Sequence, residues 1–499
     1  MSIQAALSSA LSSLAAEQRQ SAILANNIAN ANTPGYVRRE LPRSERLVAG
    51  VGSGVSTGAT TRAADSALAA ASRAADASEA YALRMQKSLE AYNSAIGQPA
   101  DERSLSSRLG AFREAMTTLS SAPDNAVAQA QALSAAQDLV GALHAMDSAV
   151  SGARSNADLD IQKDVEAVND ALDSLAEVDR QMAQASARGA STAEYEDRRD
   201  TLLADISARL PVRIYNNGPG QLVLMTEGGT TIYDSTTVHH LSFTHTPSIP
   251  AEARYPAQLS GIAVDGQALR LSDSGSIAAS LKLRDGTLPQ FSDMLDQVAG
   301  RLVDAFQEAD PSLGGTLGGT PPKEFGLFTR EGAAGWDPGD PDAVPPRAGS
   351  MVLGLAREIA INPLADPEQS GGELWRLRTG MGASGEGLAT DNSIILGALD
   401  AMDADRLYDK STGLPGTMTL SEAAAQSVGL MQGARATWTD RAETRSSLAL
   451  EARQDLTNKT AVNVDEELQR LLLVQQTYSA SVQVIKAVGS MLDELTQIR

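Results

Sequence analysis

The side chains best suited to chemistry in this sequence are three histidines, His239, His240 and His245, which follow Asp234. Imidazole and carboxylate groups are common protein ligands of zinc, so this cluster is the one candidate for a metal site. The segment is expected to contain a strand, however, and adjacent side chains on a strand point to opposite faces. A shared metal ion would need a further ligand from a distant segment, so we favour surface or turn histidines.

Two other kinds of site can be assessed directly. The glycines between residues 314 and 319 are not followed by the Gly-Lys-Ser/Thr of a phosphate-binding loop, so we interpret them as a flexible linker. The chain has no cysteine, which excludes disulfide bonds and thiolate metal sites. No catalytic constellation emerges, and we expect no enzyme activity, no cofactor and no metal.

Length, charge and hydropathy set the broad class of protein. A chain of 499 residues is long enough for roughly two to four domains. Its 41 Lys+Arg and 62 Asp+Glu give a formal net charge of −21, which repels a phosphate backbone and argues against binding of nucleic acid. No run of about eighteen apolar residues could span a membrane. The first twenty residues lack the features of a cleavable signal peptide, so any export must use another route.

The elements that must position these residues are mainly helices. An amphipathic pattern predicts a helix over about the first 28 residues, and the apolar stripe of this helix includes Leu7, Leu11, Leu14 and Ile28. The helix must end before Tyr36, because Pro34 presets a turn and Gly35 can adopt a positive φ. An irregular segment rich in Gly, Ser and Thr is expected to continue to about Thr61.

Three further apolar stripes predict a bundle of long helices, which are expected to end near Gly97 and Pro99, before Pro123 and near Gly189. After Pro211 the pattern changes to short apolar runs, which predicts a β-rich module with hairpin turns at Asn216-Asn217-Gly218, Gly228-Gly229 and Asp265-Gly266. Helix is expected again after Pro289. The Gly- and Pro-rich segment from 311 to 350 is expected to be a loop or a small irregular insertion.

Two capping boxes mark the starts of two long helices near the carboxyl end. Thr419 with Glu422, and Asn463 with Glu466, have the required spacing. The stripe of the last helix is formed by Val464, Leu468, Leu471, Gln475, Tyr478, Val482, Ile485 and Leu492. Narrow apolar stripes at both ends of a chain need partners, so we expect the two terminal helices to form an antiparallel or coaxial pair. An ordinary two-helix closure of a monomer is the alternative.

The expected fold class is therefore mainly α with an inserted β-rich module. The terminal helices should pair as a coiled coil beside a long-helix bundle, a small β domain and an irregular Gly/Pro-rich insertion. The expected domains are residues 1–60 with 456–499 (terminal coiled-coil assembly domain), 61–211 with 287–310 and 392–455 (long-helix domain), 212–286 (β-rich domain) and 311–391 (small variable outer region).

Both ends of the chain also carry a resemblance to a known family. The segment Leu24–Tyr36, LANNIANANTPGY, resembles the amino-terminal signature of flagellar rod, hook and hook-associated proteins. Near the other end, Val462–Leu468, VNVDEEL, followed by Gln475–Tyr478, QQTY, resembles the matching terminal motif. Both motifs are long and stand at the expected ends, so they favour the flagellar axial family.

The middle of the chain resembles the hook-associated members of this family. The segments Tyr195–Leu203 and Leu283–Pro289 are similar to segments of those proteins. Hook and rod subunits have mainly β-rich middles, whereas long helices are expected here from residue 64 to 210. The resemblance fades between residues 311 and 391, where the family has its variable outer domain.

The resemblance implies a structural subunit that forms the junction between hook and filament and acts as a mechanical adaptor. Such subunits are exported by the flagellar type III system without a cleavable signal peptide and assemble outside the cell. The implied partners are the hook protein, hook-associated protein 3, other copies of this chain and a flagellar export chaperone, with no membrane insertion. A hook or distal-rod subunit of the same family is the alternative, followed by a secreted coiled-coil adhesin.

The expected assembly interface has two groups of residues. The stripe residues of both terminal helices should fill seams within or between subunits, since each stripe is too narrow for an isolated core. Asn26, Asn27 and Asn30 should bond backbone groups where the first helix ends or contact the next subunit, and local capping alone is an equal alternative. Thr33, Pro34 and Gly35 form the turn, and Tyr36 is expected to pack over it.

Overall fold

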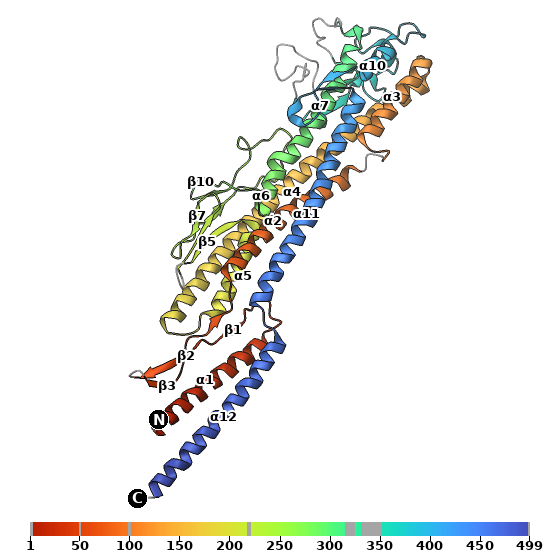
Figure 1. Cartoon of the computed structure of the whole chain (residues 1–499). Helices are drawn as coiled ribbons and strands as arrows, with labels where there is room; N and C mark the ends of the chain where they lie inside the picture. Colours follow the sequence, from red (N-terminus) through yellow and green to blue (C-terminus); the bar gives the residue numbers. More distant parts are fainter. Residues whose placement is uncertain are drawn as a thin grey trace.

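The chain is described by a computed structural model, which covers residues 3–48, 51–97, 101–216, 221–314, 325–330 and 352–497. A bundle of long helices forms an elongated body, and both chain termini lie beyond one end of it (Figure 1). Pro99, the expected turn at Asn217–Gly218 and most of the Gly/Pro-rich segment lie outside the described residues.

Long helices confirm the main element of the expected fold. The body contains α2 (Ser66–Ile96), α3 (Leu105–Ser121), α4 (Ala126–Ala187), α5 (Ala193–Arg209), α6 (Ser276–Lys282), α7 (Leu288–Glu308) and α11 (Leu420–Thr460). Gly97 follows α2 and Gly189 follows α4, both with positive φ, as the sequence predicts for helix ends. Thr419 and Glu422 form the expected capping box at the start of α11.

The largest core surrounds α7, which is buried along nearly its whole length and packs against α4, α8, α10 and α11. Aromatic rings fill this core. Tyr92 of α2 lies 5.5 Å from Phe291 of α7, and Phe112, Phe306 and Phe328 form a cluster with centroids 4.9 to 5.7 Å apart. These contacts lock three helices and one strand together at the end of the body away from the termini.

The segment from residue 311 to 418 contributes to this same core. Its described elements are a 3-10 turn (Pro311–Leu313), β11 (Phe328–Arg330), α8 (Leu355–Glu358), β12 (Ile359–Ile361), a second 3-10 turn (Pro363–Ala365), α9 (Arg376–Thr379), α10 (Ser393–Asp403), β13 (Arg406–Leu407), a third 3-10 turn (Lys410–Thr412) and β14 (Thr417–Met418). Strand β11 pairs with β12, and Phe328, Leu355 and Ile359 are fully buried. Of the segment 311–350, the described residues 311–314 and 325–330 form a 3-10 turn and one short strand, as a small irregular insertion rather than a plain loop would, and their apolar side chains join the core of the body.

The expected β-rich module is present and packs against α4 and α5. Two three-stranded antiparallel sheets are formed by β5 (Val212–Asn216), β6 (Leu222–Thr226) and β7 (Thr231–Tyr233), and by β8 (Leu241–Ser242), β9 (Ala263–Val264) and β10 (Gln267–Ala268). Asp265 and Gly266 both have positive φ, as a tight hairpin turn between β9 and β10 requires. The core of the module includes residues of α4, α5 and α6. A π-helical turn, η1 (Leu283–Thr287), then leads from α6 into α7.

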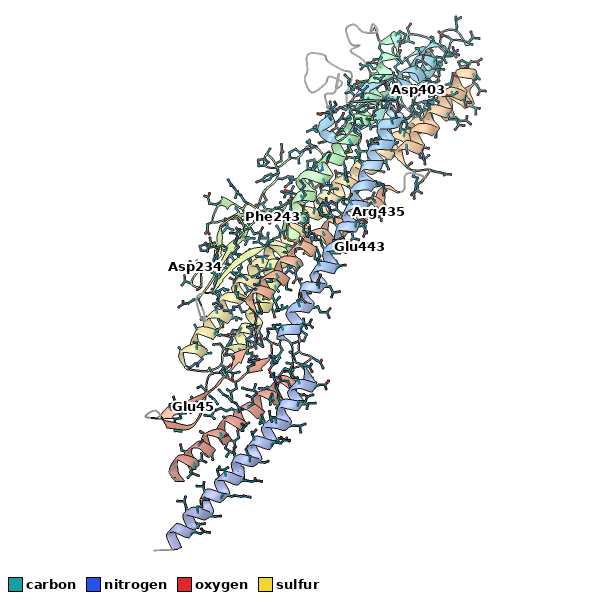
Figure 2. The ribbon with its side chains drawn as sticks, viewed as in Figure 1. Glu45, Asp234, Phe243, Asp403, Arg435 and Glu443 are labelled. Carbon is teal, nitrogen blue, oxygen red and sulfur yellow. The ribbon has the colours of Figure 1, made fainter. Side chains whose placement is uncertain are left out.

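Beyond the body lie α1 (Ile3–Ala29), α12 (Val464–Gln497) and four short strands. β1 (Arg39–Glu40) pairs with β4 (Thr61–Arg62), and β2 (Arg43–Val48) forms a hairpin with β3 (Val51–Thr57). The expectation of an irregular segment up to Thr61 is thus wrong. The strands lack a clear apolar alternation, and contacts with α1 support them instead. Figure 2 shows Glu45 on this projecting hairpin and Asp403 at the opposite end of the molecule.

Candidate assembly interface at the terminal helices

The two terminal helices lie side by side and run in opposite directions (Figure 1). Two hydrogen bonds fix this orientation. Asn27, near the end of α1, contacts Glu467 in the first turn of α12, and Ser13 contacts Ser481 at 3.3 Å. From the first contact to the second, the residue number falls along α1 and rises along α12, so the two helices are antiparallel. This is one of the two arrangements that the sequence predicts.

Within the chain, α12 presents a line of half-buried and buried residues to α1. This line is formed by Glu467, Leu471, Val474, Val482, Ile485 and Val488. Three of the expected stripe residues belong to it. The others remain exposed, namely Val464, Leu468, Gln475, Tyr478 and Leu492. The assignment of these exposed residues to contacts between subunits stays a prediction.

Helix α1 is covered on two sides. Leu7, Leu14 and Ile28 are half-buried, whereas Leu11 is half exposed. The second covering element is the β2–β3 hairpin, where the Val55 amide donates to the hydroxyl of Ser12 at 3.1 Å. Arg43 of the hairpin also forms an ion pair of 2.9 Å with Glu17, whose side chain is almost completely buried. The hairpin thus packs on a face of α1 that α12 does not cover.

The buried side chain of Asn27 joins four segments of the chain. Its Nδ2 donates to Glu467 Oε2 at 2.8 Å and to the carbonyl oxygen of Arg39 at 3.0 Å. Its Oδ1 accepts from the Tyr36 hydroxyl at 2.8 Å and from the Arg39 amide at 3.0 Å. Every hydrogen-bonding position of this amide is used, so Asn27 links α1, the turn, β1 and α12.

The Asn-Thr-Pro-Gly-Tyr turn has the geometry that the sequence predicts. Gly35 has a φ of +78°, and a β-carbon added there would lie 3.0 Å from the Thr201 hydroxyl of α5. Asn30 donates to the carbonyl of Asn26 at 2.9 Å, a local contact at the helix end, and contact of these asparagines with the next subunit stays a prediction. The guanidinium carbon of Arg39 lies 4.9 Å from the centre of the Tyr36 ring, and the packing of Tyr36 over the turn stays a prediction. Burial raises the pKa of Tyr36, so its hydroxyl stays protonated as a hydrogen-bond donor.

A group of charged residues fastens this turn region to the body. Arg39 and Arg62 face each other in the β1–β4 ribbon, an arrangement that two like charges disfavour. Carboxylates from α5 compensate for it. Asp197 lies 2.8 Å from both guanidinium groups, and Asp200 lies 2.6 Å from Arg62. Burial raises the pKa of Asp197 even though both arginines oppose that shift. We call Arg39, Arg62, Asp197 and Asp200 the charged clamp.

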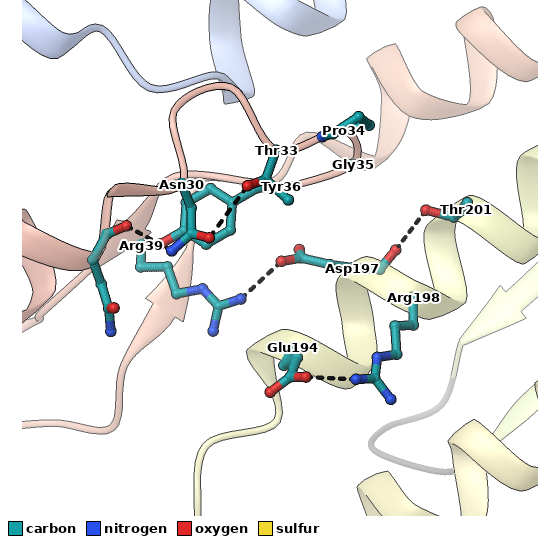
Figure 3. A pocket seen from close by; sticks show the side chains of 11 residues that line it. Asn30, Thr33, Pro34, Gly35, Tyr36, Arg39, Glu194, Asp197, Arg198 and Thr201 are labelled. Carbon is teal, nitrogen blue, oxygen red and sulfur yellow. Dashed lines mark hydrogen bonds and ion pairs between the residues drawn. The ribbon is translucent and has the colours of Figure 1, made fainter. Parts of the chain in front are cut away.

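A polar pocket of about 400 Å³ lies between the turn and α5 (Figure 3). Its walls are formed by Asn26, Asn30, Thr33, Pro34, Gly35, Tyr36, Arg39, Glu194, Asp197, Arg198 and Thr201. Six of the expected interface residues therefore gather around one hollow. Figure 3 shows Arg39 reaching across toward Asp197, while Glu194 and Arg198 pair with each other on α5.

The three histidines of the β module do not converge on one point. His239 lies 2.6 Å from Asp265, His240 lies 2.9 Å from Asp173, and His245 lies 2.7 Å from Asp158. Asp173 and Asp158 lie at different positions along α4, and Asp265 lies in the turn between β9 and β10, so the three rings have separate carboxylate partners. Among the described residues, no three histidine or acidic side chains are grouped closely enough to hold a metal ion.

Comparison with known families identifies the chain by its parts. Residues 89–325 match the helical domain of flagellar hook-associated protein FlgK. Residues 7–36 match the flagella basal body rod protein family, and residues 454–498 match the carboxyl-terminal domain of the flagellar basal body rod FlgEFG proteins. Together these matches support a flagellar hook-associated protein of the FlgK type. The terminal matches cover both helices of the antiparallel pair, and the helical match covers most of the body.

Individual relatives of this hook-associated chain are distant. It is 23% identical over 239 residues to flagellar hook-associated protein 1 of Bacillus subtilis, which covers 45% of this chain and 47% of the relative. The chain thus aligns with about half the length of that curated relative. The solved structure of the flagellar hook junction protein FlgK from Burkholderia pseudomallei is 20% identical. It matches with a TM-score of 0.43 over 52% of this chain and 46% of that chain.

Sequence reasoning found the turn and missed the charged clamp of this hook-associated chain. Asp197 lies 158 positions after Arg39, so no local pattern connects them. Two signals were present: acidic residues at the start of α5 and arginines on either side of the β2–β3 hairpin. Glu467 also went unassigned, because a carboxylate next to a leucine stripe is ordinarily a solvated residue.

In the described helices no segment is long and apolar enough to cross a membrane.

Proposed function

We propose that this chain is a structural subunit of the flagellum that joins the hook to the filament and acts as a mechanical adaptor between them. The observation that carries the proposal is the uncovered apolar surface of α12. Leu472 and Leu473, for example, are 60% and 63% exposed, and this helix lies in the segment that matches the carboxyl-terminal domain of the flagellar basal body rod FlgEFG proteins. A helix that is apolar on several sides is normally buried. Other copies of the chain supply that burial.

Charge distribution supports the same proposal. Residues 1–60 and 461–499 together carry eight Lys+Arg and eight Asp+Glu, so the whole formal net charge of −21 lies on residues 61–460. Neutral terminal segments can approach each other closely without the repulsion that an acidic surface would cause. The acidic bodies repel one another, which favours contact between copies through the terminal helices alone.

The partners of the proposed assembly are further copies of the chain, the hook protein and hook-associated protein 3. Its proposed route is export as an unfolded chain by the flagellar type III system, with a dedicated chaperone, to an extracellular location in the flagellum. A role built on contacts between subunits requires no catalytic site, so the proposal is of a protein that is not an enzyme. The helical-domain match favours this role over that of a hook or distal-rod subunit.

The test is deletion of the gene in its own host, followed by complementation. Deletion should leave hooks without filaments and release flagellin into the medium. A Leu472→Glu/Leu473→Glu variant should fail to restore filaments, because burying two carboxylates without partners costs several kcal/mol. A Leu388→Glu/Leu407→Glu variant, which alters exposed leucines far from the terminal helices, should restore them.

Two results would oppose the proposal separately. Normal filaments in the deletion strain would remove the junction role. Restoration of filaments by the Leu472→Glu/Leu473→Glu variant would leave the junction role standing but would remove the exposed face of α12 from the assembly.

A further inference from the structure

Residues 244–260 leave the second sheet of the β-rich module and return to it without forming a helix or a strand. The base of this segment is closed twice. Strand β8 pairs with β9, and the Thr244 amide donates to the Ser260 hydroxyl at 3.0 Å, which donates to the Thr244 carbonyl at 2.9 Å. Figure 2 labels Phe243, the residue that precedes the segment. We call residues 244–260 the strap, and its joined ends let it swing outward without a change in the sheet.

The apolar side chains of the strap belong to neither main core. Ile249, Ala253 and Leu259 are 1 to 3% exposed and form a small cluster with one another. The structure describes every residue of the strap, and none of them is part of the core around α7 or of the core shared by the β-rich module, α4 and α5. Movement of the strap as a unit therefore exposes little of the apolar area that stabilises the body.

Polar contacts hold the strap on α4. Arg154 of α4 is fully buried, and its guanidinium donates to three carbonyl oxygens of the strap. These carbonyls belong to Pro250, Ala251 and Ala253, at 3.1, 3.4 and 2.6 Å. Asp158, also fully buried, lies one turn further along α4. Its carboxylate accepts from the Thr246 amide at 2.7 Å and contacts the His245 ring at 2.7 Å.

Two effects oppose closure of the strap. Burial lowers the pKa of Arg154 to about 10, because the guanidinium loses its hydration there. Arg254 of the strap and Arg284 of η1 lower this pKa further, because like charges repel. Arg254 has its own partner in Asp293 of α7, at 2.5 Å. Charges thus both favour and oppose the closed position, so we expect the strap to open at a lower free energy than an apolar core.

From this geometry we propose that the strap opens and closes as one unit on the folded body, and that Arg154, Asp158 and Asp293 are the positioning residues that hold it closed. The closed strap connects the β-rich module to α7. The open strap leaves the module on α4 and α5 but releases that connection, and it uncovers Arg154, Asp158 and Arg284, which are all 0% exposed here. This inference concerns a single chain and does not rest on the junction role.

Hydrogen exchange of the unaltered full-length chain tests whether the strap is a separate unit. The reporter amides are those of Thr246 and Ile249, because their acceptors are the side chains of Asp158 and Ser155 on α4. We expect protection factors about 100-fold or more below those of amides in the central strand β6. Low concentrations of urea should hardly change the exchange of the strap amides, because opening exposes little surface.

Substitutions then test the residues that hold the strap. Asp293→Asn removes the ion-pair partner of Arg254 and leaves the repulsion between Arg254 and Arg154. Exchange of the two strap amides should accelerate about tenfold, since this ion pair is partly buried, and β6 should not change. The matched control is Asp403→Asn, which breaks an ion pair with Arg113 at the far end of the molecule and should leave the strap unchanged (Figure 2).

Arg154→Met is the stronger variant, because three strap carbonyls lose their donor at once. It should accelerate exchange of the strap amides about 100-fold or more. If Arg154→Met does not fold, the unaltered chain and Asp293→Asn decide the question.

Three outcomes would overturn the inference. Equal protection and equal urea dependence of the strap and of β6 would show that they open together. Equal effects of Asp293→Asn and Asp403→Asn on the strap amides would show that the contact with α7 does not hold it. Acceleration of β6 as large as that of the strap in Asp293→Asn would make the strap a part of the module's own fold.

Discussion

Replacement of Asp197 by alanine tests how the terminal helices are held to the body. Its carboxylate is the ion-pair partner of Arg39 at 2.8 Å and also lies 2.8 Å from Arg62. Arg62 would keep Asp200 at 2.6 Å and Glu196 at 3.3 Å. For the guanidinium of Arg39, the remaining described contact is the ring of Tyr36. The loss therefore falls mainly on Arg39 and on the β1–β4 ribbon.

The magnitude follows from the burial of these groups. Breaking a fully buried ion pair by removing one partner costs about 3 to 5 kcal/mol, and an exposed pair is worth about 1 kcal/mol or less. The side chains of Arg39 and Asp197 are 17% and 12% exposed, so water can reach the remaining charge in part. We expect a cost of about 2 to 3 kcal/mol, which is roughly a 30- to 150-fold change in an opening equilibrium.

Hydrogen exchange of backbone amides measures that opening. The informative amides are those of Arg38, Arg39 and Ala63, which donate to Thr460, Asn27 and Arg38 respectively. Their exchange should accelerate by the factor given above, while amides in the centre of α7 should not change. The matched control is Glu194→Ala on the first turn of α5, because the ion pair of Glu194 with Arg198 is exposed on both sides. Its effect should be below about 0.5 kcal/mol.

The reasoning would be refuted if Asp197→Ala and Glu194→Ala accelerated exchange equally. It would also be refuted if faster exchange appeared throughout the body, because the clamp would then stabilise the fold as a whole. An acceleration limited to the ribbon and the first turns of α12 would confirm that this cluster holds a local boundary.

Three further predictions concern other parts of the chain. Burial raises the pKa of Asp296 to about 7, so protonation of this carboxyl stabilises the folded chain, and that contribution to the free energy of unfolding is lost as the pH rises from about 4 to about 7. In urea unfolding, the free energy should fall less over this pH range for Asp296→Asn than for the unaltered chain. Gly35→Val should lower the free energy of unfolding by about 1 to 3 kcal/mol, because Gly35 has a positive φ. The effect should exceed that of Gly189→Val, because Gly189 also has a positive φ but no atom lies near its added β-carbon. Equal effects in thermal unfolding would exclude a clash of the Gly35→Val side chain with α5. Phe328→Ala should lower the unfolding free energy by about 3 to 5 kcal/mol, and Leu388→Ala by less than about 0.5; similar midpoints would place Phe328 outside the core.

Helices could be predicted well from this sequence because their signals are local. The repeat of apolar residues at steps of three and four, together with Gly97, Gly189 and Thr419, located the ends of α2, α4 and the start of α11. Each signal depends on residues within a few positions of one another. The hairpin turn at Asp265–Gly266 is a local signal of the same kind, and it was also predicted correctly.

The strands near the amino terminus could not be predicted in this way. The sequence from Arg43 to Val48 has no apolar alternation, and the hairpin is held by α1 through Ser12 and Glu17. Described residues after 311 were missed for a related reason. Phe328 and its neighbours are short apolar runs among glycines and prolines, and their burial depends on a core built by helices elsewhere in the chain.

The face of α12 shows the limit of hydrophobic patterns most clearly. Leucines and valines occur around much of its circumference, so the stripe could be predicted only approximately. The predicted stripe includes Leu468 and Gln475, which lie one position away from the buried residues Glu467 and Val474. The place of Glu467 could not be predicted, because its partner Asn27 lies 440 positions away.

The described contacts at the boundary between the terminal helices and the body are mainly polar, whereas the aromatic cluster inside the body is apolar. Asn27 connects α12 to β1, and Asp197 connects the same ribbon to α5, so one chain of directional contacts crosses the boundary. Such contacts require accurate geometry and are weakened by water, unlike the contacts around Phe112 and Phe306, which depend on area alone. A load that changes the angle between the two parts would therefore open the polar contacts first and leave both packed parts intact, as an adaptor between two structures of different stiffness requires.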